Sequence, residues 1–154
     1  MMITYRKAVL SDVGKLAEIR GMMLKEMKNV TSEEERMCIE QANLEYFRKA
    51  LCDNTFIAWI ALDNEEIVAT SGLSFSVVPP FFPVLDGKVA YIMNMFTLPS
   101  YRKLGIGTEL FKRVVDEAKQ LGYKKITLHA TDMGKPLYEK FGFKDVPNEM
   151  VFFV

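Results

Sequence analysis

Residues Lys103 to Thr108 have the spacing of a binding site for a phosphate or pyrophosphate group. An apolar stretch ends at Leu98-Pro99, and two glycines then allow a tight turn with no Cβ in the way of a ligand. The amides of Leu104 to Thr108 begin a helix, so several have no carbonyl partner within it and lie at the positive end of its dipole. We therefore predict an anion site formed by backbone N–H groups at this corner.

The spacing excludes two common phosphate-binding motifs. A dinucleotide fingerprint requires Gly or Ala three residues after Gly107, where this chain has Leu110. A Walker loop requires Gly-Lys-Ser or Gly-Lys-Thr, which is absent. What remains is Arg-x-x-Gly-x-Gly at the start of a helix, a pattern that also occurs at ordinary glycine-rich helix starts.

A second motif, Leu-Tyr-Glu-Lys-Phe-Gly-Phe at Leu137 to Phe143, follows the first after one intervening strand. Together and in this order, the two motifs resemble the GNAT superfamily of N-acetyltransferases. The resemblance is sharp from Val89 to Phe143 and only architectural before that. It implies a mixed α/β fold of the GNAT acyl-CoA acyltransferase type. Such a fold has a central, mostly antiparallel twisted sheet of about six to seven strands with a splayed parallel pair, flanked by about four helices.

The resemblance also implies acetyl-CoA as co-substrate, with no metal. The strand before the corner would pair through its main chain with the pantetheine arm, and an amide near Phe96 would face the thioester carbonyl oxygen. Thr131 stands where relatives often carry an Asn that contacts the cofactor. The positions carried over from the family as cofactor-binding are Met95, Phe96, Thr97, Arg102, Lys103, Leu104, Gly105, Ile106, Gly107, Thr108 and Thr131.

Tyr138 occupies the place of the general acid in the second motif. A phenol has a reference pKa of about 10 and a thiol of about 8.5, so proton transfer to the departing thiolate suits both groups. The alternative is that Tyr138 only packs beneath the cofactor. No general base is identifiable, because Tyr91 to Thr97 contains no carboxylate and the single histidine, His129, is interpreted as structural. Water, a carboxylate such as Glu26, or an amine that arrives neutral all stay open as alternatives.

A strand, a helix and a strand must position these motifs. We predict them at Lys88–Leu98, Gly105–Leu121 and Lys124–Ala130, joined as a parallel crossover. A short helix over Leu137–Phe141 and a last strand over Glu149–Val154 complete the sheet. The predicted buried face of the long helix is formed by Leu110, Phe111, Val114, Val115 and Ala118.

The first half of the chain predicts a strand at Ile3–Ala8 and two helices, one from Val13 to about Lys28 and one from the capping box Ser32-x-x-Glu35. In the family, these helices form one wall of the acceptor cleft. An antiparallel pair of strands follows at 55–62 and 67–78. The proline-containing stretch Pro79–Gly87 is a loop whose apolar side chains either pack on the domain, pack across a dimer, or form a lip of the acceptor cleft.

Composition limits the classes of protein. The chain has 154 residues, 49% hydrophobic and 26% charged, which fits one domain spanning residues 1–154. Twenty basic residues balance twenty acidic ones, which argues against nucleic acid as a partner. The chain lacks an apolar run of the ~18 residues that a membrane span needs. Two cysteines and the absence of a leader pattern predict the cytoplasm, and the ten methionines are expected to fill gaps in the core.

These observations predict an N-acetyltransferase that moves the acetyl group of acetyl-CoA to an amine of a small molecule or peptide, by direct attack in a ternary complex. Two alternatives stay open. One is transfer of a longer acyl group, and the other is a non-catalytic sensor or interaction module that binds CoA or acyl-CoA. The apolar loop Phe81–Leu85 and the last strand predict a homodimer.

Overall fold

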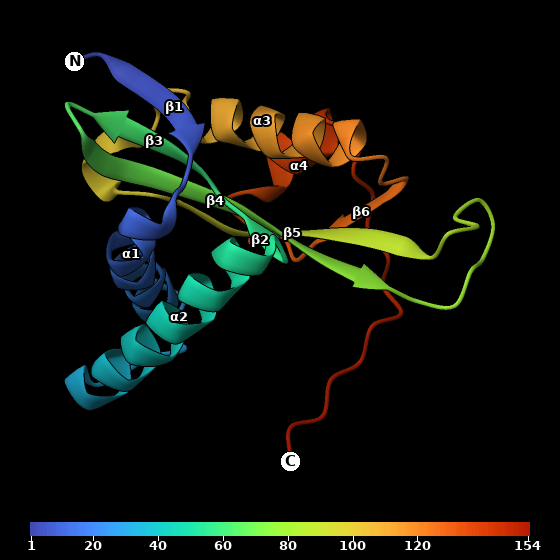
Figure 1. The fold of residues 1–154 in the computed structure, drawn as a ribbon, viewed down its shortest axis with the longest axis horizontal. Helices are drawn as coiled ribbons and strands as arrows, with labels where there is room; N and C mark the ends of the chain where they lie inside the picture. The colour runs from blue at the N-terminus through green and yellow to red at the C-terminus, as the bar shows by residue number, and fades with distance from the viewer.

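A six-stranded sheet forms the centre of the fold, with helices on both faces (Figure 1). The computed structural model describes all residues from Met1 to Val154. Every pair of neighbouring strands is antiparallel except β5 and β6, which are parallel, as predicted. In spatial order the strands are β1 (Ile3–Lys7), β3 (Trp59–Asp63), β4 (Glu66–Val77), β5 (Lys88–Thr97) and β6 (Lys125–Leu128), and β2 (Phe56–Ile57) also pairs with β4.

The helices form two layers. α1 (Val13–Glu26) and α2 (Glu33–Asp53) cover one face of the sheet, and α3 (Ile106–Gln120) and α4 (Lys135–Lys140) cover the other (Figure 1). Short 3₁₀ turns, η1 (Leu10–Asp12) and η2 (Pro99–Tyr101), lead into α1 and toward α3. None of these helices combines the length and the hydrophobicity that a membrane crossing requires.

The sheet separates two cores. The buried face of α3 contains all five residues predicted for it, together with Ile106 and Glu117, so its helical periodicity was a reliable signal. Opposite, α1 and α2 pack on the sheet through a cluster that includes Leu16, Ile19, Phe47, Phe56 and Ile60. α2 contributes less, since only Phe47 and Ala50 of its residues are buried.

Local signals set most element ends. Ser32 Oγ accepts a hydrogen bond from Glu35 N at 3.1 Å, which confirms the predicted cap of α2. The Glu35 carboxylate instead accepts from Thr31 N at 2.7 Å. α1 ends at Glu26, earlier than predicted, because Lys28 adopts a left-handed conformation with φ of 61°.

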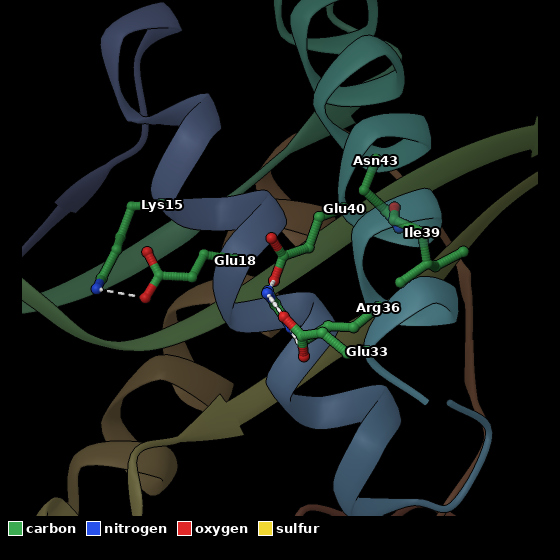
Figure 2. A network of polar contacts seen from close by, with 7 residues as sticks. All are labelled: Lys15, Glu18, Glu33, Arg36, Ile39, Glu40 and Asn43. Atoms are coloured by element: carbon green, nitrogen blue, oxygen red, sulfur yellow. Dashed lines mark hydrogen bonds and ion pairs between the residues drawn. The ribbon is translucent and has the colours of Figure 1, made fainter. Parts of the chain in front are cut away.

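The first turns of α2 carry a network of charges (Figure 2). Arg36 forms ion pairs with Glu33 and Glu40 along the same helix. On α1, Gly21 leaves space for Glu40, whose Cγ would lie 2.9 Å from a Cβ at that position. The ion pairs of Arg36 and the packing of Glu40 on Gly21 thus supplement the few apolar contacts of α2.

The predicted last strand is wrong. Residues 149–154 form no strand, and Phe152 and Phe153 are each 86% exposed. A turn at Pro147–Asn148 directs the chain away from β6, so its backbone has no ladder partner and the terminus extends from the sheet (Figure 1). The sheet therefore has six strands, the lower number of the predicted range.

Two other expectations need correction. The loop Pro79–Gly87 precedes β5 and so lies at the far end of that strand from Thr97, with Val84 buried and Phe82 exposed. It does not form a lip of the cavity described below. No methionine is fully buried, and only Met93 and Met95 pack against the core, so the prediction that methionines fill core gaps holds for these two alone. Half of the ten methionines line that cavity instead: Met23, Met27, Met93, Met95 and Met133.

Candidate active site

The parallel strands β5 and β6 separate before β5 ends. Their pairing runs from Val89 opposite Lys125 to Ile92 opposite Leu128, where β6 stops. β5 continues to Thr97 and keeps β4 on its other edge. The edge of β5 from Met93 to Thr97 therefore has unpaired main-chain groups, and it borders a cavity of about 440 Å³. This is the splay that the resemblance implied.

A bulge redirects the backbone of β5 inside this splay. The register with β4 shifts between Thr70 and Gly72, opposite Met93 to Phe96. Asn94 within the bulge has φ of 59°, and Thr70 Oγ1 donates a hydrogen bond to its carbonyl oxygen at 2.9 Å. Bulges of this kind reorient main-chain and side-chain groups beside functional sites. Here the bulge brings Asn94 to the wall of the cavity.

The corner after β5 has free amides, as predicted. Lys103, Leu104 and Gly105 donate no backbone hydrogen bond, and the first amides of α3 have no carbonyl within the helix. Lys103 and Gly105 both adopt left-handed conformations, with φ of 63° and 79°. A Cβ at Gly105 would meet nothing within 4 Å, and one at Gly107 would approach only Thr97 Oγ1, at 3.7 Å. The corner is thus open to a ligand.

Arg102 connects this corner to β5 and α1. Its Nε donates to the Thr97 carbonyl oxygen at 2.9 Å, and its Nη atoms donate to both Glu26 oxygens at 2.8 and 2.7 Å. These hydrogen bonds from Arg102 lower the pKa of Glu26, so its carboxylate stays ionised and occupied. The arrangement argues against Glu26 as the general base.

Tyr138 lies on α4 with its ring packed on Phe111, at 4.8 Å between centroids. Gly134 allows this position, because a Cβ there would lie 2.8 Å from the phenol oxygen. Burial raises the pKa of Tyr138, and its hydroxyl donates no hydrogen bond within the chain. A protonated phenol with a free hydroxyl thus lines the cavity.

The structure brings only part of the predicted set together. Lys103 to Thr108 lie at the corner beyond the cavity, and Thr97 uses its carbonyl for Arg102. The hydroxyl of Thr131 accepts from Gly134 N at 3.2 Å and supports the turn before α4. The predicted residues that line the cavity are Met95, Phe96, Arg102, Thr131 and Tyr138.

Sequence reasoning missed a chain of polar groups on the cavity wall. Tyr91 Oη lies 2.9 Å from His129 Nδ1, and His129 Nε2 lies 2.8 Å from Glu149 Oε2. Tyr91 and His129 both line the cavity. Alternation placed His129 inside a strand predicted to reach Ala130, whereas β6 ends at Leu128, and it gave no sign that Tyr91 of β5 would bond to His129.

Arg20 and Asn94 were also missed. Both line the cavity, and Arg20 Nη1 donates to Asn94 Oδ1 at 3.4 Å. No local motif identifies these two residues. Arg20 is one of several basic residues in its helix, and Asn94 belongs to no recognisable sequence motif.

Known proteins resemble this chain in sequence. A model described as Acetyltransferase (GNAT) family matches residues 24–143. The uncharacterized N-acetyltransferase YhfO of Bacillus subtilis is 30% identical over 115 residues, which cover 71% of this chain and 74% of that protein. A glucosamine 6-phosphate N-acetyltransferase of Trypanosoma brucei brucei is 28% identical over 79 residues, covering 51% of this chain and 54% of that protein. The chain thus spans about half the length of some curated relatives.

Solved structures share the whole fold. A predicted acetyltransferase from Clostridium acetobutylicum, crystallised with acetyl-CoA, has a TM-score of 0.89 and 34% identity, and the match covers 99% of this chain and 96% of that one. A GCN5-related N-acetyltransferase from Ralstonia eutropha has a TM-score of 0.88 and 26% identity over 99% of both chains. The splayed strands, the open corner and these likenesses agree. The chain therefore belongs to the acetyltransferase (GNAT) family and is an acyltransferase enzyme.

Proposed function

We propose that this enzyme moves the acetyl group of acetyl-CoA to the amine of a small molecule or peptide, by direct attack in a ternary complex. The observation that supports this most is the continuous path from the unpaired edge of β5 to the free amides before α3. Along that path the chain offers hydrogen-bonding groups without a partner of their own. An acyl-CoA presents the amides and phosphates that such groups bind.

The corner Lys103–Thr108 would hold the diphosphate through backbone amides, and the edge Met95–Thr97 would hold the pantetheine arm. Because the Thr97 carbonyl already accepts from Arg102, we assign Arg102 to shaping this edge. Thr131, on the opposite wall of the cavity, would contact the arm from the α4 side. When bound, acetyl-CoA supplies the thioester carbonyl that the amine attacks.

Tyr138 is proposed as the general acid. Its half-buried position raises the pKa of the phenol, which stays protonated at neutral pH, and its hydroxyl has no competing partner in the chain. Such a group can deliver a proton to the departing thiolate sulfur. The packing of its ring on Phe111 fixes the orientation of the hydroxyl.

The amine must also lose a proton, and His129 is the candidate acceptor. Its Nδ1 bonds to Tyr91 Oη at the cavity wall, and Glu149 fixes the other ring nitrogen. A histidine held by a carboxylate is a common general base. The proton would pass from the amine through the Tyr91 hydroxyl to His129.

Three wider expectations remain proposals. We propose that residues 1–154 act as one domain, since all six strands belong to one sheet. Free, exposed Cys38 and Cys52 are consistent with a reducing cytoplasm. A homodimer is supported by exposed Phe82 and by the exposed apolar run 150–154.

The proposal is tested by incubating the protein with acetyl-CoA and a panel of amines and peptide N-termini, and by measuring thiol release. We expect thiol release that depends on the amine, with mass spectrometry showing one acetyl group added to it. Tight binding of acetyl-CoA without acetylation of any acceptor would instead favour the sensor alternative.

A further inference from the structure

Arg20 carries a positive charge that the chain does not neutralise. Its half-buried side chain takes part in none of the ion pairs of the structure. Its hydrogen bond to Asn94 Oδ1, at 3.4 Å, is long. Burial lowers the pKa of Arg20, yet a guanidinium stays charged at neutral pH. A desolvated cation without an anion is unfavourable, and such groups are usually paired.

The groups around Arg20 form an incomplete polar cluster. The titratable side chains that interact electrostatically with Arg20 are Tyr46 and Tyr91. Both phenols are neutral at pH 7, and burial raises their pKa values further. Asn94 is 4% exposed, and its Nδ2 is buried without a partner. The cluster thus has an excess of hydrogen-bond donors and no negative charge.

The position of this cluster relates it to the acceptor. Arg20, Tyr91, Met93 and Asn94 line both the 440 Å³ cavity and a neighbouring cavity of about 380 Å³ beside α2. Tyr138 lines only the first. A molecule that places its amine near Tyr138 could therefore extend past Asn94 toward the second cavity and bring another of its groups to Arg20.

We infer that Arg20 binds a carboxylate or phosphate group of the acceptor, so that the enzyme prefers anionic amines. This inference rests on the proposed function. Both anions match the planar guanidinium, which can donate two parallel hydrogen bonds to their oxygens. The donor excess around Asn94 favours the same kind of group, and Met93 supplies an apolar wall beside it.

The anion site can be tested without turnover. Inorganic phosphate and acetate are titrated separately into the protein while NMR follows the side-chain resonances of Arg20 and Asn94. We expect saturable shifts that Arg20→Met abolishes and that Arg48→Met, at an exposed and unpaired arginine of α2, leaves unchanged. Shifts with phosphate alone indicate a phosphorylated acceptor, and shifts with acetate alone a carboxylate. No saturable shift with either anion would overturn the inference.

Steady-state turnover provides a second test of the anion site at Arg20. Phosphoethanolamine is compared with ethanolamine, and glycine with glycinamide, so that each pair differs in one anionic group. The anionic member should have a kcat/KM about 10- to 100-fold higher, an advantage that Arg20→Met removes through KM. An advantage that persists in Arg20→Met would contradict the assignment. If no amine reacts, the proposed function fails, whereas saturable anion shifts would still support the site at Arg20.

Discussion

The corner before α3 and the wall formed by α1 and α2 border the same site but are built in different ways. The corner offers backbone amides without a partner, which we propose as the groups that bind CoA, and the buried stripe of α3 lies behind them. The wall presents side chains, among them Arg20 and Met23 of α1 and Met27 just after it, and its second helix, α2, buries only two residues. α2 carries ion pairs of Arg36 with Glu33 and Glu40 in its first turns (Figure 2).

This difference matches the two ligands. A cofactor shared by many enzymes can be held by main-chain groups that most substitutions leave in place. An acceptor that differs between enzymes needs side chains that can change without disturbing the fold. Methionines suit such a wall, because their flexible side chains adapt to different shapes. We therefore place recognition of CoA at the corner and the choice of acceptor at the wall.

The largest expected effect comes from filling the corner. Gly107→Trp should weaken binding of CoA by at least about 100-fold, because the indole would cover amides that make charge-assisted hydrogen bonds. Calorimetric titration with CoA measures it. Gly14→Trp is the matched control, since Gly14 lies on α1 with open space around it and outside both cavities. Equal affinity of both variants would place the nucleotide elsewhere.

Next in size is the loss of the phenol hydroxyl. Tyr138→Phe should lower kcat by about 100-fold, because the thiolate would leave without a proton donor. Binding of acetyl-CoA should change little, since the ring contact with Phe111 is retained. Steady-state kinetics combined with titration of CoA separates the two quantities. Unchanged kcat would remove the acid role and leave Tyr138 as a packing residue.

A smaller effect, on stability, is expected at Asp12, the residue just before α1. Asp12 accepts hydrogen bonds from Arg6 at 2.7 and 3.0 Å and from Val9 N, and these bonds lower its pKa. A depressed folded-state pKa means that the stabilisation is complete above the unfolded value of about 3.9 and is lost as the pH falls through the folded value. Asp12→Asn should lower the free energy of unfolding by about 1–2 kcal/mol at pH 7.

Urea denaturation at pH 7 and at pH 2.5 tests this prediction for Asp12. The difference between the wild type and Asp12→Asn should shrink at the lower pH, where the wild-type carboxyl also becomes protonated. An equal difference at both pH values would mean that the charge of Asp12 contributes nothing to stability.

The smallest effect is expected at the contact between the two regions. Glu26→Gln removes the charge that holds Arg102, which should weaken CoA binding by about 3- to 10-fold. The pH dependence of kcat should stay as in the wild type, because Glu26 is already ionised and paired. Loss of the acidic limb of that profile in the variant, where kcat falls as a general base becomes protonated, would restore Glu26 as the base.

The same contrast decides what the sequence could predict. The corner was predictable because two glycines, a proline-ended strand and the start of a helix are consecutive, and local geometry depends on such neighbours. The periodicity of α3 also predicted its buried face. Only the family resemblance identified Tyr138, since one tyrosine in a short helix has no distinctive pattern.

The wall could not be predicted in the same way. Arg20 and Asn94 are 74 residues apart, and they meet at the bulge of β5, which depends on the register with β4. The cavity positions of Met23 and Met93 depend equally on how the helices pack. The last strand was predicted wrongly because an apolar run at 149–154 does not specify a pairing partner.

The central claim is that backbone amides at the corner bind the diphosphate of CoA. A crystal structure of the protein soaked with CoA tests it most directly. The account predicts diphosphate oxygens within hydrogen-bonding distance of amides in Lys103–Thr108 and the pantetheine arm along Met95–Thr97. A CoA molecule bound elsewhere, with these amides free of it, would contradict the account.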